Sequence, residues 1–294
     1  MGKIKKLSTL SIFLLILTGC ARLDSIPYTP RQTPESWLEI QPFLNLRIGG
    51  YEFILVQPSS TVFVYLLGII TVALGLYFFR IRRNHQSRKW WGIALLLWGL
   101  GALFAGTSYQ AFSYEIKCAG KAICSWTSWW EILYLVLSVA SIDAMLISGA
   151  FSSSKDKYRQ ALIYIAMLKF ICYCVLVAIG IFTLSKFLIS FELLLIFTAP
   201  DILFLFILNG WRYLKYRNRM DSALSLTWIW LGAIIAIYFI YLVLGITENL
   251  WEHGLWFSEN DLLHIGLISW MLYIGFRVAK LVRDEPFLAL DENK

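Results

Sequence analysis

The chain has 294 residues, of which 59% are hydrophobic and only 15% are charged, and its mean hydropathy is +0.65. A soluble domain would have about 25% charged residues, so this composition excludes an ordinary soluble enzyme. The net charge of +7 does not indicate a nucleic-acid partner, because basic residues in membrane proteins sort to one side of the bilayer. The apolar residues fall in blocks of about twenty, which is enough to cross a bilayer core of about 30 Å. We therefore expect an integral membrane protein whose partner is membrane lipid.

The first twenty residues have the features of a secretory signal. Three lysines precede a short apolar run, Leu7–Leu17, and small residues follow it. The sequence LTGC at 17–20 resembles a bacterial lipobox, in which the cysteine is acylated. We expect residues 1–19 to be a signal peptide, Cys20 to carry a lipid, and the protein to lie in a bacterial inner membrane. The alternative is an uncleaved signal anchor in which Cys20 is an ordinary apolar-segment thiol.

Residues 20–60 are expected to form a lipid-anchored tether outside the cytoplasm. Three prolines and the lack of periodicity at its start indicate extended chain. Further along, apolar residues alternate on either side of Gly49-Gly50, which is a hairpin signal. The alternative for this part is irregular chain lying on the membrane surface.

Seven apolar blocks follow and predict an all-α bundle of seven transmembrane helices over residues 61–279, with a tail at 280–294. The blocks are 61–79, 90–112, 130–150, 160–183, 187–209, 223–246 and 261–279.

The charges of the connecting segments alternate along the chain. Sixteen basic residues fall on one side: Arg80, Arg82, Arg83, Arg88, Lys89, Lys155, Lys157, Arg159, Arg212, Lys215, Arg217, Arg219, Arg277, Lys280, Arg283 and Lys294. Six fall on the other: Arg22, Arg31, Arg47, Lys117, Lys121 and Lys186. The positive-inside rule then predicts an N-terminus outside and a C-terminus inside. The lipobox-like motif requires the same orientation on separate grounds.

Two cysteines, Cys118 and Cys124, lie in the outer connection between the second and third helices. An oxidising compartment permits a disulfide across this short gap. The alternative is two free thiols.

Three ionisable residues lie within the predicted spans at a similar depth, roughly 10–14 Å from the cytoplasmic end at 1.5 Å per residue. They are Asp143, Lys169 and Asp201. Two acids and one base at one depth predict a buried ion cluster. Such a cluster can serve as structural contact between helices or as part of a proton path.

Polar residues also gather toward the outer ends of four helices. We expect Glu131, Asp261 and His264 to be catalytic or metal-ligating groups, and Ser108, Gln110, Tyr114, Glu192 and Asn260 to bind substrate in one outer-leaflet pocket. The alternative is ordinary helix capping, since Ser258 and Asp261 have the spacing of a capping box, together with interhelical hydrogen bonds.

Two segments that contain these residues resemble parts of a known protein family. GTSYQAFSYE at 106–115 and NDLLH at 260–264 are similar to helices two and seven of the membrane hydrolases that include alkaline ceramidases and progestin/adiponectin-type receptors. The resemblance implies a zinc-activated water acting on a lipid amide, with Ser108 and His264 in two of the family's site positions. The chain departs from the pattern at Phe112 and Asn260, where the family has histidines, and Glu131 is the nearest acid to the family's aspartate.

One histidine with an amide and carboxylates suits a hard divalent ion such as Ca²⁺ or Mg²⁺ better than zinc. A divalent metal is therefore the cofactor we consider. Three functions stay open. The first is a divergent metal-dependent hydrolase of a lipid or lipid-linked substrate. The others are a non-enzymatic sensor or binding protein, and a carrier that links the outer pocket to the inner ion cluster.

Overall fold

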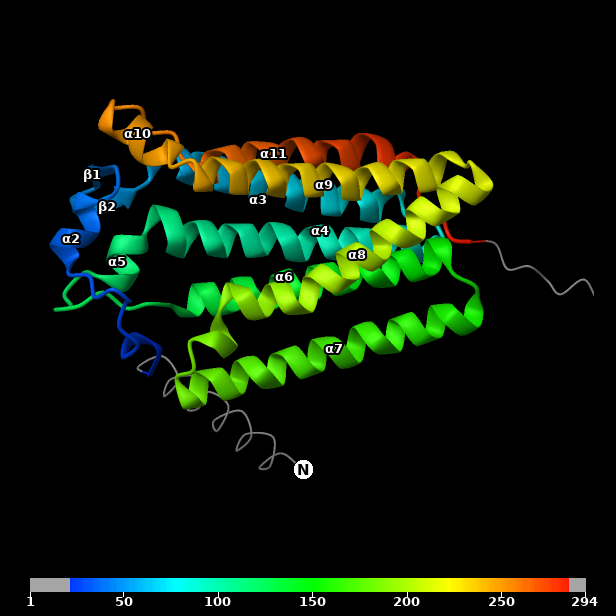
Figure 1. Ribbon diagram of the computed structural model, residues 1–294, viewed down its shortest axis with the longest axis horizontal. Helices are drawn as coiled ribbons and strands as arrows, with labels where there is room; N and C mark the ends of the chain where they lie inside the picture. The colour runs from blue at the N-terminus through cyan, green and yellow to red at the C-terminus, as the bar shows by residue number, and fades with distance from the viewer. Residues whose placement is uncertain (1–21, 286–294) are drawn as a thin grey trace, which may run out of the picture.

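The computed structural model describes residues 22–285, with the backbone alone for Asp156. Within this part, seven helices are long and apolar enough to cross a membrane, and they lie side by side along one axis (Figure 1). The expected helix bundle is confirmed. The helices are α3 (Pro58–Ile81), α4 (Gln86–Ala105, extended by π-helix η1, Gly106–Ala111), α6 (Trp129–Ser153), α7 (Asp156–Thr183), α8 (Phe191–Tyr216), α9 (Arg219–Val243) and α11 (Glu259–Tyr273, continued by π-helix η3, Ile274–Val278, and α12, Ala279–Leu281).

Side-chain caps set several of the helix starts. Residues 187–189, expected within the fifth span, form a separate 3₁₀ turn, η2 (Phe187–Ile189), and α8 begins only after Ser190. The Ser190 hydroxyl accepts a hydrogen bond from the Leu193 backbone N–H, which would otherwise lack a partner in the first turn. Asn218 caps α9 in the same way.

Glycines let α3 and α4 approach closely. A Cβ on Gly99 would lie 2.8 Å from the Val72 backbone nitrogen, and one on Gly92 would lie 3.1 Å from the Gly75 carbonyl oxygen. Small residues at such positions are the usual means by which membrane helices bring their backbones together. The main apolar core joins α3, α4, α6, α9 and α11. By contrast, only 17% of the apolar window of α7 is buried, so this helix lies at the periphery.

One end of the bundle, here called the hairpin end, carries short elements. They are α2 (Pro34–Glu39), β1 (Phe43–Ile48), β2 (Tyr51–Val56), α5 (Ser113–Lys117) and α10 (Ile246–Glu252) (Figure 1). The two strands pair antiparallel, with Ile48 opposite Tyr51 and Leu46 opposite Phe53. The alternation around Gly49-Gly50 in the sequence therefore corresponds to a hairpin.

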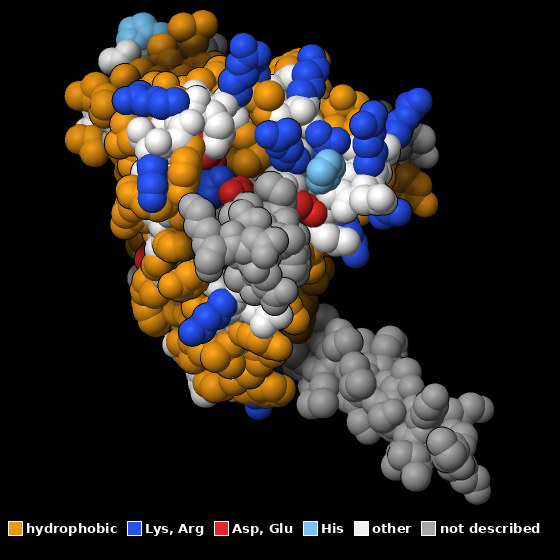
Figure 2. All heavy atoms as spheres, turned by 90° about the vertical axis from the view of Figure 1, so that its right-hand side faces the viewer, with side chains coloured by type: hydrophobic (Ala, Val, Ile, Leu, Met, Phe, Trp, Pro, Cys, Tyr) orange, Lys and Arg blue, Asp and Glu red, His pale blue; other side chains and the backbone are white. Residues whose placement is uncertain are grey.

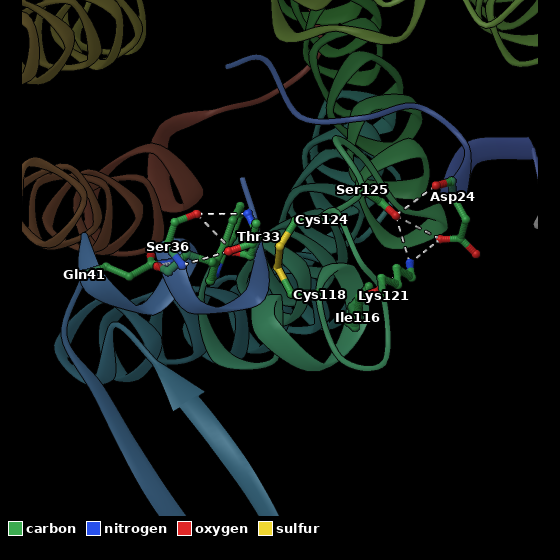
Figure 3. The surroundings of a disulfide bond; sticks show 10 residues. Asp24, Thr33, Ser36, Gln41, Ile116, Cys118, Lys121, Cys124 and Ser125 are labelled. Carbon is green, nitrogen blue, oxygen red and sulfur yellow. Dashed lines mark hydrogen bonds and ion pairs between the residues drawn. A yellow bond between two sulfur atoms is a disulfide. The ribbon is translucent and has the colours of Figure 1, made fainter. Parts of the chain in front are cut away.

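A disulfide between Cys118 and Cys124 is part of this end of the protein (Figure 3). Both cysteines are buried and pack with Trp37 of α2, and the Tyr28 backbone N–H donates to the Cys124 carbonyl at 3.1 Å. Lys121 forms a 2.8 Å ion pair with Asp24. Residues 24–37 thus contact the loop after α5, so the start of this segment is folded against the bundle and is not the extended tether that we expect from the sequence.

The opposite end, here called the basic end, consists of the turns at 82–85, 154–155 and 217–218 and of residues 282–285. Figure 2 looks onto this end and shows lysine and arginine side chains gathered on it. Asp284 accepts hydrogen bonds from the backbone N–H groups of Gln86 and Ser87 at 2.8 and 2.7 Å. The segment after α12 therefore caps α4, whose own N-cap residue, His85, makes no capping hydrogen bond with its side chain.

Candidate functional site

Asp143, Lys169 and Asp201 form one ion cluster inside the bundle, contributed by α6, α7 and α8 respectively. The Lys169 Nζ lies 2.8 Å from Asp143 Oδ1 and forms a second ion pair with Asp201. Relative to full exposure, the side chains of Asp143, Lys169 and Asp201 are 6%, 17% and 10% exposed. Two carboxylates therefore share a single ammonium group in an apolar setting.

The backbone of α8 also takes part in this cluster. Lys169 donates a hydrogen bond to the Phe197 carbonyl oxygen at 2.7 Å. Pro200 lies inside α8, one residue before Asp201. A proline lacks the N–H that would close the helical turn, so it weakens the hydrogen-bond ladder at this point. The part of α8 that meets Lys169 therefore lacks one backbone N–H donor.

Apolar side chains close the cluster off toward the basic end. Leu205 lies one turn beyond Asp201, is 1% exposed, and packs against Gly149 of α6, where an added Cβ would lie 2.5 Å from Leu205 Cδ2. Toward the hairpin end, Tyr173 and Phe197 pack with their ring centroids 5.2 Å apart. The Tyr173 hydroxyl is buried without a hydrogen-bond partner.

A second polar network lies beyond Leu205. Arg212 of α8 donates to Asp221 of α9 at 3.1 and 3.2 Å, to Glu285 at 2.8 Å and to the Ser153 carbonyl oxygen at 2.9 Å. Asn209 is 1% exposed and accepts a long hydrogen bond from the Ser153 hydroxyl. Leu205 thus separates two polar groups of side chains on the same helix.

Glu131 is held in a third polar group, at the hairpin end. It forms a buried ion pair with Lys117 of α5 and accepts a 2.8 Å hydrogen bond from Ser108, which also contacts Ser128. The Lys117 ammonium lies 4.8 Å from the centre of the Tyr109 ring. Each charge is therefore neutralised locally, and the carboxylate of Glu131 is already engaged.

Burial at this end also affects Tyr28, which lies in the segment before α2. Burial, and secondly the nearby Glu131 carboxylate, raise the pKa of the Tyr28 phenol above its ordinary value. The Lys117 ammonium lies 6.0 Å from the centre of the same ring. The N-terminal segment therefore helps to exclude water from the Lys117–Glu131 pair.

Asp261 caps α11 and binds to α3. Its carboxylate accepts hydrogen bonds from the hydroxyls of Ser59 and Ser60 at 3.0 and 2.9 Å and from the Ser258 backbone N–H at 2.6 Å. This is a full capping box. His264 lies one turn further on and is 8% exposed, and its Nδ1 has no hydrogen-bond partner.

The expected substrate-binding residues have separate surroundings. Gln110 is buried with an unpartnered Oε1. Tyr114 packs against the cluster of Trp37 and the disulfide. Glu192 is exposed in the first turn of α8, and Asn260 donates only a long hydrogen bond to the neighbouring Glu259. The π-helix η1 and the break at Phe112 change the helical phase between Gln110 and Tyr114, which a regular helix would place on one face.

Glu131, Asp261 and His264 do not form a metal-binding group. Within the part of the chain that the structure describes, no three or more histidine, cysteine, aspartate or glutamate side chains are placed so as to hold a metal ion. Glu131 is paired with a lysine and Asp261 with serines, so two of the three expected ligands have other partners. Cys20, the expected lipidation site, lies outside the described residues.

Sequence reasoning did not identify three important partners. In the sequence, Lys117 is only one of the basic residues on the outer side, and Ser59 and Ser60 fall within the expected tether. Lys117 could have been suspected because it adjoins a cysteine expected in a disulfide. The serines precede the first span directly and have no such signal.

The fold and these polar groups define a multi-pass helical membrane protein with several buried ion pairs. The chain belongs to a family of unknown function (DUF6962), whose model matches residues 60–282. No curated protein matches the chain. No solved structure matches it either.

Proposed function

We propose that the protein is a proton-linked membrane carrier and that the cluster of Asp143, Lys169 and Asp201 is its proton-binding centre. The observation that carries the proposal is the sharing of one ammonium group by two carboxylates between α6, α7 and α8. Ionisable groups within membrane spans are costly, and they commonly mark ion or proton pathways.

Charge counting supports a role for one proton. With all three groups ionised, the cluster has a net charge of −1, and uptake of one proton makes it neutral. An uncompensated charge in an apolar interior is expensive. The cluster can therefore couple the gain or loss of a proton to a change in helix packing.

The surroundings of the cluster correspond to a closed state. Leu205 and Gly149 block the route toward the basic end, and the Tyr173–Phe197 pair blocks the route toward the hairpin end. The weak point of α8 at Pro200 adjoins the cluster, so a bend there would open one side. The released proton would leave through water on the basic side, past Asn209 and the ion-paired Arg212.

We place the basic end in the cytoplasm of a bacterial cell and the hairpin end outside it, because of the distribution of lysine and arginine. The disulfide at the hairpin end favours the same orientation, since oxidising conditions lie outside the cytoplasm. The lipid on Cys20 belongs to the same proposal.

The hydrolase function implied by the resemblance to the alkaline ceramidase group finds no support in the site. The residues that would serve it are divided between the Lys117–Glu131 pair and the Asp261 cap. The family match does not indicate a hydrolase either.

The experiment is proton uptake into lipid vesicles that contain the purified full chain, driven by an imposed membrane potential and followed with a trapped pH-sensitive dye. We expect uptake by the wild type to exceed that by Asp201→Asn. Glu192→Gln is the matched control, because it removes an exposed acid from the same helix. Equal uptake by the wild type and Asp201→Asn would overturn the proposal.

A further inference from the structure

We infer that a pocket at the basic end, between α8, α9 and η3, binds the phosphate of an anionic phospholipid headgroup. The cavity measures about 280 Å³, close to the lower limit of roughly 300 Å³ for small-molecule sites. A phosphate-bearing headgroup fits such a volume, whereas the acyl chains would have to lie outside it. This inference does not depend on the proposed carrier function.

Three arginines line the pocket: Arg217, Arg219 and Arg277. All three are exposed, and none forms an ion pair with a carboxylate of residues 22–285. No acidic residue lines the cavity. Three unpaired guanidinium groups around one cavity repel one another, so an anion would lower the free energy of the arrangement.

The acid closest in sequence to Arg217 and Arg219 is already paired with another residue. Asp221 lies two residues after Arg219, but it is fully buried and its carboxylate receives hydrogen bonds from Arg212. It also accepts a hydrogen bond from the side-chain amide of Asn218. The positive charge of the pocket is therefore not neutralised by its neighbour.

The walls of the pocket are fixed by interactions of their own. The Tyr273 hydroxyl donates to the Ala223 carbonyl oxygen at 3.2 Å, and the Arg217 guanidinium lies 5.4 Å from the centre of the Tyr213 ring. A guanidinium presents two parallel N–H donors to a phosphate, which a lysine cannot do. The pocket thus has both the charge and the donor geometry for a phosphate group.

The position of the pocket favours a lipid as the source of that phosphate. Arg277 lies four residues before the end of the last helix at Leu281, or about 6 Å along the axis. Phe276 and Leu214 adjoin the lining residues Arg277 and Tyr213 in sequence. Their exposed fractions are 67% and 66%, and their side chains would face acyl chains. Basic pockets between membrane helices at this level bind anionic headgroups.

The test uses the purified full chain in detergent micelles and three titrants: phosphatidylglycerol, phosphatidylcholine and inorganic phosphate. Bound lipid is counted by native mass spectrometry, and stabilisation is read as the shift in melting temperature. The pocket variant is Arg219→Gln/Arg277→Gln. The matched control is Arg82→Gln/Arg83→Gln, which removes two exposed arginines at the same end of the bundle but outside the pocket.

We expect phosphatidylglycerol, but not phosphatidylcholine, to bind and stabilise the wild type and the control variant. The pocket variant should bind it about tenfold more weakly, because two charge-assisted contacts are lost. Stabilisation by inorganic phosphate alone, lost in the pocket variant, would keep the phosphate site but overturn the lipid as its source. Equal binding by the two double variants, or no preference for phosphatidylglycerol, would overturn the inference. If the pocket variant is not folded in the detergent micelles, the two single variants replace it.

Discussion

Leu205 of α8 occupies the space above Gly149 of α6, so closely that a Cβ on Gly149 would lie 2.5 Å from Leu205 Cδ2. This contact lies between the ion cluster of Asp143, Lys169 and Asp201 and the polar network around Arg212. In the proposed carrier, this contact is the apolar barrier between the ion cluster and the basic end.

The barrier can be tested by changing both partners. Gly149→Ala should lower the free energy of unfolding by about 1–3 kcal/mol, because a methyl group is forced into a filled space. Gly149→Ala/Leu205→Ala should be more stable than the sum of the two single changes predicts. Unfolding in denaturing detergent measures both. Gly210→Ala on α8 is the control, since a Cβ there meets no atom within 4 Å, and an equal loss in this control would contradict the assignment.

The same barrier predicts a change in function. Leu205→Ala removes side-chain volume between the two polar groups, so water should enter and the leak of protons into vesicles should rise above that of the wild type. Passive decay of a pH gradient measures this leak. A leak unchanged in Leu205→Ala, with the protein still folded, would show that Leu205 is not the barrier.

The charges of the ion cluster predict that replacing its different members will lower the protein's stability by different amounts. Asp201→Asn leaves one carboxylate with one ammonium, a neutral pair, and should cost little stability. Lys169→Met leaves two buried carboxylates without a partner and should cost about 3–5 kcal/mol. Melting temperatures of the two variants and of Asp143→Asn give the comparison. A loss in Asp201→Asn as large as that in Lys169→Met would mean that the cluster serves only to hold α7 in place.

The sequence was sufficient to predict the seven helices and their order, because each span is a long apolar block with basic residues near every second connection. It also placed Asp143, Lys169 and Asp201 at one depth, since depth depends only on the rise per residue. The helix ends were less predictable. Hydropathy places residues 187–189 in the fifth span, whereas the cap at Ser190 begins the helix after them.

The positions and partners of the outer polar side chains could not be predicted from hydropathy and spacing. A regular helix would have placed Gln110 and Tyr114 on one face, but the π-helix η1 re-aims the side chains around it. Lys117 pairs with Glu131 only because the chain turns back after α5. That turn depends on tertiary contacts with residues 22–57, and no local pattern in the sequence specifies it.

The Lys117–Glu131 pair should be important for stability. Glu131→Gln leaves the Lys117 ammonium buried without a partner and should cost about 3–5 kcal/mol. The double change Lys117→Met/Glu131→Gln should recover part of this loss, since neither charge is then left alone. Denaturant unfolding of the three variants measures the coupling energy. No recovery in the double variant would show that the two residues do not act as a pair.

Reduction of the Cys118–Cys124 disulfide should loosen the hairpin end but leave the helices folded. The closed loop is short, with six residues of sequence separation, so we expect a loss of about 2 kcal/mol, at the low end for a disulfide. Amide hydrogen exchange of residues 22–57 should rise in Cys118→Ser/Cys124→Ser. Cys172→Ser/Cys174→Ser on α7, which removes two free thiols, is the control and should leave this exchange unchanged.

The most direct test of the central claim is to observe the proton itself. Infrared difference spectra of the protein in lipid, recorded between neutral and acidic pH, report a carboxyl group that takes up a proton within the membrane. We predict a protonated-carboxyl band that is lost or shifted in Asp143→Asn and in Asp201→Asn and is retained in Glu192→Gln. A band that is unchanged in both cluster variants would contradict the account, since the cluster would then exchange no proton.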